Sequence, residues 1–161
     1  MKSENSDEVL VVLGGPQIQF VAPMLPRDDA HCVMQAIFPP GFTVPLHSHV
    51  DRESFFLLSG ELEGFNGDEW VTLRSGDIFD VPGGRRHAWR NVAAEPASLV
   101  VVTTARMGRF FREVGRRAVA RTGPPSPEEL QRFVETSARY EHWLGSPDDN
   151  AAVGIALPRP H

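Results

Sequence analysis

A series of short, β-favouring runs separated by glycine, proline and aspartate constrains this chain more than any other feature. The runs cover residues 9–13, 17–22, 32–38, 54–58, 69–73, 78–81, 88–92 and 99–104. The 161 residues include 14 glycines and 14 prolines, which favour tight turns between short elements. Strands at this spacing are typical of a sandwich or a barrel. We therefore predict one all-β domain over residues 9–104, preceded by an acidic leader at residues 1–8.

The spacing of apolar residues becomes helical after residue 104. A first helix is expected to bury one stripe of apolar side chains, namely Met107, Phe110, Phe111, Val114 and Ala118. Its other face carries Arg109, Arg112, Arg116 and Arg117. The simplest interpretation is a solvated face on a helix docked to the barrel, and the alternative is a contact with a membrane or an acidic partner.

A second helix is predicted from the residues that cap it. Ser126, Pro127 and Glu129 form a capping box with proline at the first helical position. The helical period then continues to Leu144, and Gly145 provides a stop. We expect a helical extension over residues 105–145 and a tail without regular structure over residues 146–161.

Composition excludes several classes of function. Cys32 is the single cysteine, so disulfides within the chain and multi-thiolate metal sites are excluded, and a cytoplasmic location is expected. Lys2 is the single lysine, and it lies in the leader, which disfavours Schiff-base chemistry. The net charge of −5 argues against nucleic-acid binding, and the chain has no apolar run long enough for a membrane span.

Three histidines and a glutamate form the most informative cluster. His47 and His49 are one residue apart, so an extended strand points both rings to the same face. Glu53 follows after a short turn, and His87 follows a turn rich in glycine and proline. Three imidazoles and one carboxylate are ligands that first-row divalent metals accept.

These residues also fit two known motifs at every fixed position. Residues Gly41, His47, His49, Glu53 and Gly60 match G(X)5HXH(X)3,4E(X)6G. Residues Gly76, Pro82, Gly84, His87 and Asn91 match G(X)5PXG(X)2H(X)3N. Both are cupin motifs, so the chain resembles a small single-domain cupin over residues 9–104. The two C-terminal helices also resemble the tails of small cupins that are called quercetin-dioxygenase-like.

The resemblance implies a jelly-roll β-barrel in which one divalent metal ion, Fe, Mn, Ni, Cu, Co or Zn, is bound by His47, His49, Glu53 and His87. It implies that the first three ligands lie on one hairpin and the fourth on another. We expect a dioxygenase-like oxidoreductase acting on a small aromatic or enolic molecule that chelates the metal. Glu53 can alternatively serve as a general base. A metal-dependent isomerase, lyase or cyclase, and a non-catalytic metal- or metabolite-binding protein, stay open as alternatives. The resemblance also implies a homodimer.

Strand alternation predicts further side chains that face the site. Phe55, Leu57 and Trp89 share a face with the ligands, and Phe79 is a candidate for the substrate pocket beside them, although core packing is the more common role of such a side chain. Met34 and Phe38 are further candidates for the wall. Gln35 either faces solvent or offers its amide to the substrate. Arginines in the two ligand-bearing turns, Arg52, Arg85 and Arg86, are candidates for holding a substrate carboxylate, although exposed turn arginines are more common.

Overall fold

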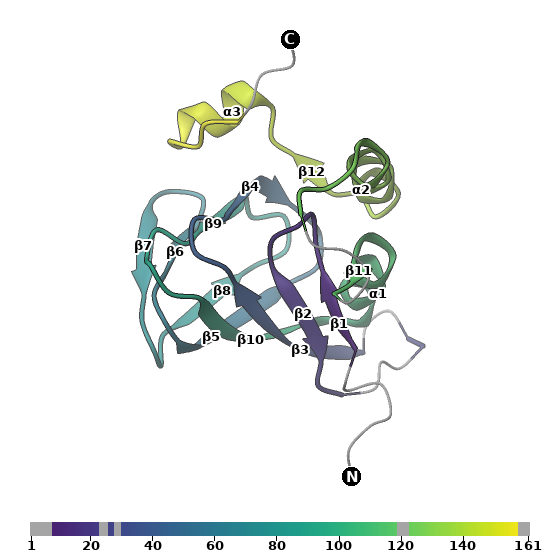
Figure 1. The fold of residues 1–161 in the computed structure, drawn as a ribbon, viewed down its shortest axis with the longest axis horizontal. Coiled ribbons are helices and arrows are strands. Elements are labelled where there is room, and N and C mark those ends of the chain that lie inside the picture. Colours follow the sequence, from purple (N-terminus) through teal and green to yellow (C-terminus); the bar gives the residue numbers. More distant parts are fainter. Residues whose placement is uncertain (1–7, 23–25, 28–29, 119–122, 158–161) are drawn as a thin grey trace.

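The computed structural model describes residues 8–22, 26–27, 30–118 and 123–157. Antiparallel strands in these residues form two sheets around an apolar core (Figure 1). One sheet has the order β11 (Arg116–Arg117), β1 (Val9–Val11), β2 (Gln17–Phe20), β3 (His31–Phe38), β10 (Ala97–Thr104), β5 (Glu53–Ser59) and β8 (Ile78–Val81). The other has the order β12 (Trp143–Leu144), β4 (Thr43–Ser48), β9 (His87–Arg90), β6 (Leu62–Phe65) and β7 (Trp70–Leu73). The predicted β jelly roll with C-terminal helices is confirmed. Residues 1–7 of the predicted leader lie outside the described residues.

Each of the eight predicted runs corresponds to a strand, but β4 and β6 were missing from that prediction. β4 contains Pro45, which lies where the pairing of β4 with β9 shifts register between Val44 and His47. Proline is tolerated in strands at such irregularities, so it did not exclude a strand here. β6 contains Gly64, where an added Cβ would lie 2.9 Å from the rings of both Phe79 and Trp89. Glycine is needed there because core aromatics pack directly on the strand.

The first helix is shorter than the apolar pattern predicted. α1 spans Ala105–Val114, begins at the Thr104 cap and ends at Gly115. The chain beyond it is extended, and β11 pairs with β1, so Ala118 does not continue the helical stripe. The four arginines therefore do not form one helix face. Arg117 and Arg112 lie 2.9 and 4.0 Å from Glu8 carboxylate oxygens, and Arg116 lies 3.5 Å from Glu129, so this surface is a set of ion pairs.

The second helix begins where the capping box predicted. α2 spans Pro127–Arg139, and Ser126 and Glu129 make both bonds of the box. The helix ends five residues before Leu144, because Glu141 adopts a positive φ of 59° and the chain then pairs with β4 as β12. The tail is also not irregular: α3 (Pro147–Ala152) begins with a second capping box, formed by Ser146 and Asp149.

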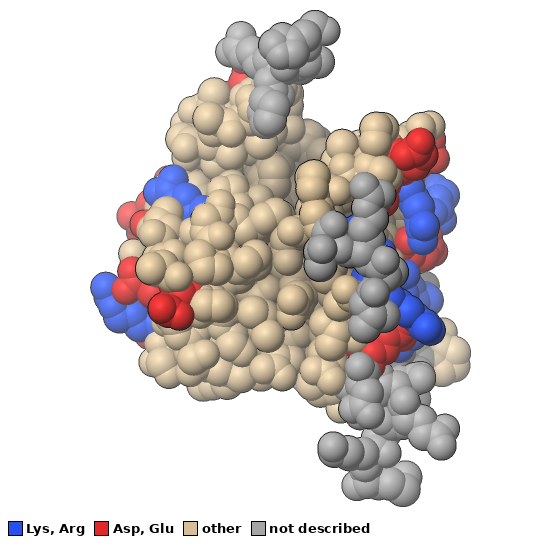
Figure 2. Space-filling model, viewed as in Figure 1, with Lys and Arg blue, Asp and Glu red and all other residues tan. Residues whose placement is uncertain are grey.

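The outer surface separates charged from uncharged regions. Lys, Arg, Asp and Glu side chains gather toward the left and right of the view in Figure 2, with a broad surface free of charge between them.

In the described part of the chain, no helix is both long enough and apolar enough to cross a membrane.

Candidate metal centre

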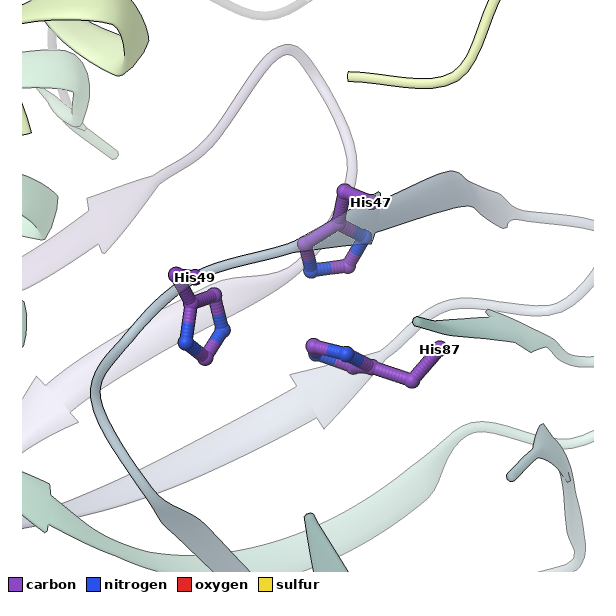
Figure 3. A group of neighbouring side chains, drawn as sticks. All are labelled: His47, His49 and His87. Carbon is purple, nitrogen blue, oxygen red and sulfur yellow. The ribbon is translucent and has the colours of Figure 1, made fainter. Parts of the chain in front are cut away.

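Three histidine side chains meet at one end of the space between the sheets. His47 lies in β4, His49 follows the end of that strand, and His87 is the first residue of β9. The two strands pair, and His47 stands opposite His87 in the register. Each ring offers one nitrogen atom, and these three atoms lie within 4.8 Å of one another. Figure 3 shows the three rings turned toward a common centre, so this His triad can bind a metal ion.

A backbone carbonyl holds each of the three rings. In each case Nδ1 lies close to the carbonyl oxygen of a residue two positions away in the sequence, at 2.7, 2.7 and 2.9 Å for His47, His49 and His87. Because a carbonyl oxygen only accepts, Nδ1 donates, and the neutral ring keeps its lone pair on Nε2. Nε2 of His49 and of His87 is buried and makes no hydrogen bond to any residue that the structure describes. Rings oriented by a second hydrogen bond in this way are typical of metal ligands.

Glu53 adds a carboxylate from the opposite sheet. It is the first residue of β5 and is 4% exposed. Its Oε2 lies 3.2 Å from Nε2 of His49 and 3.6 Å from Nε2 of His87. Burial alone would raise the pKa of Glu53, but the two imidazoles outweigh it and hold that pKa well below its usual range. An ionised carboxylate beside three imidazole nitrogens is a donor set that suits a first-row divalent metal.

The pKa values of His47 and His49 shift in opposite directions. Burial, followed by the neighbouring rings of His87 and His49, lowers the pKa of His47 well below its usual value. Burial also opposes protonation of His49, but the Glu53 carboxylate and the carbonyl of Asp51 outweigh it and raise the pKa of His49. The Glu53 carboxylate therefore favours protonation of His49 over protonation of His47.

The predicted arrangement of these ligands on two hairpins is wrong. β4 belongs to the five-stranded sheet and β5 to the seven-stranded sheet, so the turn between His49 and Glu53 crosses from one sheet to the other. The turn before His87 crosses in the same way, since β8 pairs with β5 and β9 pairs with β4. The crossings allow donors from both sheets to face one point.

A cavity of about 430 Å³ lies beside the His triad, and His47 and His49 line it. Its polar lining side chains among the described residues are His47, His49, Glu53 and His142, with the indole of Trp89 beside them. The rest of the wall is apolar and includes Phe110, Phe111, Leu130, Phe133, Val134 and Leu144. A ligand that fills it would place polar atoms at one end and apolar atoms at the other.

The predicted pocket residues divide into two groups. Phe55 and Trp89 line the cavity, as do Met34 and Phe38. Leu57 and Phe79 lie behind this lining in the core, where Leu57 is fully buried and Phe79 packs 4.7 Å from the Trp89 ring, centroid to centroid. Their predicted place in the pocket wall is therefore wrong, although the buried face was correct.

Gln35 does not offer its amide to the cavity. Met34 and its alternating neighbours in β3 are buried against the core, so Gln35 points to the outer face of the sheet. Its Nε2 donates to Ser98 Oγ at 3.2 Å. Gln35 therefore takes the other predicted position, on the solvent-facing side of the sheet.

The three turn arginines also lie away from the cavity. Arg52 donates to the Asp80 carboxylate, and Arg85 donates to Asp68. The Arg86 guanidinium stacks 4.0 Å from the centre of the Trp143 ring. None of the three lines the cavity among the described residues, so none holds a substrate carboxylate there.

Comparison with protein families bears on this site directly. The Cupin_2 family, described as "Cupin domain", matches residues 34–103. The chain carries a cupin domain. The match includes the His triad and Glu53, and it confirms the family that the two motifs indicated.

Two solved structures with TM-scores above 0.5 share the fold of this cupin domain. KdgF from Halomonas sp. is 18% identical with a TM-score of 0.55, covering 65% of this chain and 92% of that one. A predicted oxalate decarboxylase from Thermotoga maritima is 19% identical with a TM-score of 0.53, covering 65% and 98%. An uncharacterized conserved protein with a double-stranded β-helix domain, from Klebsiella pneumoniae, is 28% identical over 57% of this chain and 78% of that one, with a TM-score of 0.49. No curated protein matches the chain.

Part of the apolar wall of the cavity is built from residues that follow the cupin domain. These residues, 105–157, are called the C-terminal segment below. Phe110 and Phe111 come from α1, whereas Leu130, Phe133 and Val134 come from α2. The apolar helix patterns indicated buried faces, but they did not indicate that those faces would enclose part of the site.

His142 is the functional candidate that sequence reasoning missed. It lines the cavity, and its ring centre lies 5.2 Å from that of His49 and 4.3 Å from that of Phe110. Burial, followed by the neighbouring His49, lowers the pKa of His142 to about 4. It belongs to no motif, so the sequence carried no signal for it beyond its being one of six histidines.

A polar network joins the C-terminal segment to the metal end of the cupin domain. The buried Asp51 carboxylate, in the turn after His49, accepts from Thr104 Oγ1 at 2.7 Å and from Arg106 Nη1 at 2.8 Å. Arg106 Nη2 also donates to the carbonyl of Tyr140 at 2.9 Å. One guanidinium therefore connects the turn that orients His49 with the connection that carries His142.

Proposed function

We propose that this protein is a mononuclear metal enzyme of the dioxygenase type, acting on a small, largely apolar molecule that chelates the metal through two adjacent oxygen atoms. The observation that carries the proposal is the polarity of the cavity. Two of the three oriented imidazoles, those of His47 and His49, line a largely apolar space of about 430 Å³ together with the ionised carboxylate of Glu53 and with His142. Such a space suits an aromatic or enolic ligand with polar atoms at one end.

His47, His49, Glu53 and His87 would hold the metal, which can be Fe, Mn, Ni, Cu, Co or Zn. When bound, the metal supplies Lewis-acid chemistry and, if it is redox-active, electron-transfer chemistry. The oriented Nε2 lone pairs fit this role, because buried nitrogen atoms without hydrogen bonds are otherwise costly.

The remaining chemistry belongs to side chains of this chain. As the alternative to binding the metal, Glu53, which lines the cavity, can act as the general base for a hydroxyl or enol group that enters this end. Trp89 and Phe55 provide flat apolar surfaces beside it, which orient an aromatic ring and exclude water.

The test combines elemental analysis with an oxygen assay. Protein purified without added metal is expected to contain about one transition-metal ion per chain. Protein reconstituted with each metal is then supplied with flavonols, catechols and diketones while oxygen uptake is recorded. Uptake that depends on metal and substrate supports the dioxygenase. Metal-dependent product formation without oxygen uptake supports the isomerase, lyase or cyclase, and saturable binding without any product supports a binding protein.

We also propose that two copies pair through the outer face of the seven-stranded sheet. Large apolar side chains on that face are exposed: Phe56 by 41%, Leu58 by 40%, Ile78 by 69% and Val102 by 38%. Phe56 and Ile78 are directly paired across β5 and β8, so the exposed surface is continuous there. Light scattering is expected to show a dimer for the wild type and for Val92→Glu, whose parent residue is exposed in a loop, and a monomer for Ile78→Glu. A monomeric wild type contradicts this proposal.

A small-molecule partner follows from the cavity, whereas a nucleic-acid or membrane partner does not. The net charge of −5 disfavours binding to polyanions. We propose a cytoplasmic location, since Cys32 is buried, forms no disulfide and suits a reducing compartment.

A further inference from the structure

One polar atom in the cavity has no role in the site as described so far. Nε2 of His142 is buried and makes no hydrogen bond to any residue in the described ranges. A buried polar nitrogen without a partner is destabilising, so such atoms are normally satisfied by protein, water or ligand. Because His142 lines the cavity, the space beside its ring is the space that a ligand would occupy.

The position of His142 is defined by strand pairing. Trp143 pairs with Ser48 and Leu144 pairs with His47 as β12 runs antiparallel to β4. The same register continued by one residue places His142 opposite His49, in agreement with their ring contact of 5.2 Å. The β12–β4 pairing therefore brings a fourth imidazole to the polar end.

Further contacts hold this connection rigidly. The backbone N–H of His142 donates to the carbonyl of Ser137 at 2.8 Å, and the N–H of Gly145 donates to the carbonyl of Leu46 at 2.8 Å. The His142 ring packs against Phe110 on one side. A side chain fixed at both its backbone and its ring is pre-organised to contact a ligand.

We propose that His142 hydrogen-bonds an oxygen atom of the ligand bound at the His triad, which makes it a specificity-determining residue that the C-terminal segment adds to the cupin domain. This inference rests on the function proposed above. It narrows the ligand to an apolar molecule with two neighbouring oxygens at one end, of which one belongs to a hydroxyl group within reach of His142. His142 is not one of the three histidines whose nitrogens lie within 4.8 Å of one another, so a contact to the ligand is favoured over a metal bond.

The experiment compares two probes that differ by one oxygen. 3-Hydroxyflavone has adjacent hydroxyl and carbonyl oxygens, and flavone lacks the hydroxyl. Zinc-loaded protein is used, because zinc has no redox chemistry and binding can be measured without turnover. Affinity is read from quenching of tryptophan fluorescence, to which Trp89 in the cavity wall contributes, and the zinc content of each variant is measured.

Three variants isolate the role of the imidazole. His142→Phe keeps a flat ring but removes both nitrogens, and His142→Gln restores a hydrogen-bonding group. Tyr140→Phe is the matched control, because Tyr140 lies two residues away and its hydroxyl donates to Glu113. His142→Phe is expected to bind 3-hydroxyflavone about tenfold more weakly, as for one lost hydrogen bond, with flavone binding and zinc content unchanged. His142→Gln is expected to recover part of the loss, and Tyr140→Phe to match the wild type.

Each other outcome overturns the inference in a recognisable way. Loss of zinc in His142→Phe would make His142 a metal ligand. If the variant binds both probes more weakly to the same extent, His142 is a packing residue. If it binds both as tightly as the wild type does, Nε2 of His142 hydrogen-bonds water and not the ligand. A wild type that holds no zinc, or that does not prefer 3-hydroxyflavone, overturns the proposed function and this inference together. A preference for 3-hydroxyflavone over flavone that is as large in His142→Phe as in the wild type overturns this inference alone.

Discussion

The two ends of the cavity are built in different ways. At the polar end, His47, His49, Glu53 and His87 come from the cupin domain, and strand register and backbone carbonyls orient the three rings. At the apolar end, side chains of the C-terminal segment, from two helices and a short strand, pack beside apolar side chains of the cupin domain. The polar end determines what chemistry is possible, and the apolar end determines which molecule fits. The two properties can therefore change separately, except where the Asp51–Arg106 network and His142 connect them.

The largest expected effect comes from removing a ligand at the polar end. His49→Ala is expected to lose the metal and all turnover, because the buried site then lacks one of the three converging nitrogens. Elemental analysis and the oxygen assay measure both. Arg52→Ala is the control, since this side chain lies in the same turn but pairs with Asp80 at the surface, and it is expected to keep the metal. An active, metal-free His49→Ala protein would contradict the proposed function.

The four candidate ligands of the polar end could be predicted from the sequence, because they fit two cupin motifs at every fixed position. The apolar end could not, because its contacts join residues far apart in the chain. At the polar end His142 escaped prediction for the same reason: it meets His49 only because β12 pairs with β4, and no local pattern encodes that pairing. The error at Gln35 has another cause: in a largely apolar run, the sequence does not show which alternate face is buried.

The next effect tests whether the apolar end is independent of the metal. Phe110→Ala removes a 3% exposed ring that packs against Phe133, Tyr140 and His142. The expected cost is about 3 kcal/mol in the unfolding free energy of the metal-free protein, as for other buried phenylalanines, measured by urea titration. Metal content should not change. Leu130→Ala, at a 46% exposed position of the same wall, should cost less than about 1 kcal/mol. Loss of metal in Phe110→Ala would show that the two ends are not separable.

A smaller effect is expected at the network that connects the two ends. Arg106→Met keeps the apolar stem of the side chain but leaves the buried Asp51 carboxylate with Thr104 as its remaining side-chain donor. We expect a loss of about 2 kcal/mol in unfolding free energy, below the usual value for a buried pair because Arg106 is 21% exposed. Glu141→Gln is the control: this exposed carboxylate lies 3.7 Å from Arg106, and its loss should cost less than about 0.5 kcal/mol. If the two variants lose equal stability, the Asp51–Arg106 pair does not join the two ends.

The smallest effect concerns the start of α2. Ser126→Ala removes the side-chain oxygen that accepts from the backbone N–H of Glu129, and about 1 kcal/mol of unfolding free energy should be lost. Ser126→Asp keeps an acceptor at the cap and should retain most of the stability, which separates loss of the cap from loss of packing. Because the cap lies at the far end of α2 from the connection to β12, metal content and the preference for 3-hydroxyflavone should be unchanged. A shift in either would mean that the helix position as a whole, and not the local contacts of His142, determines which ligand the cavity accepts.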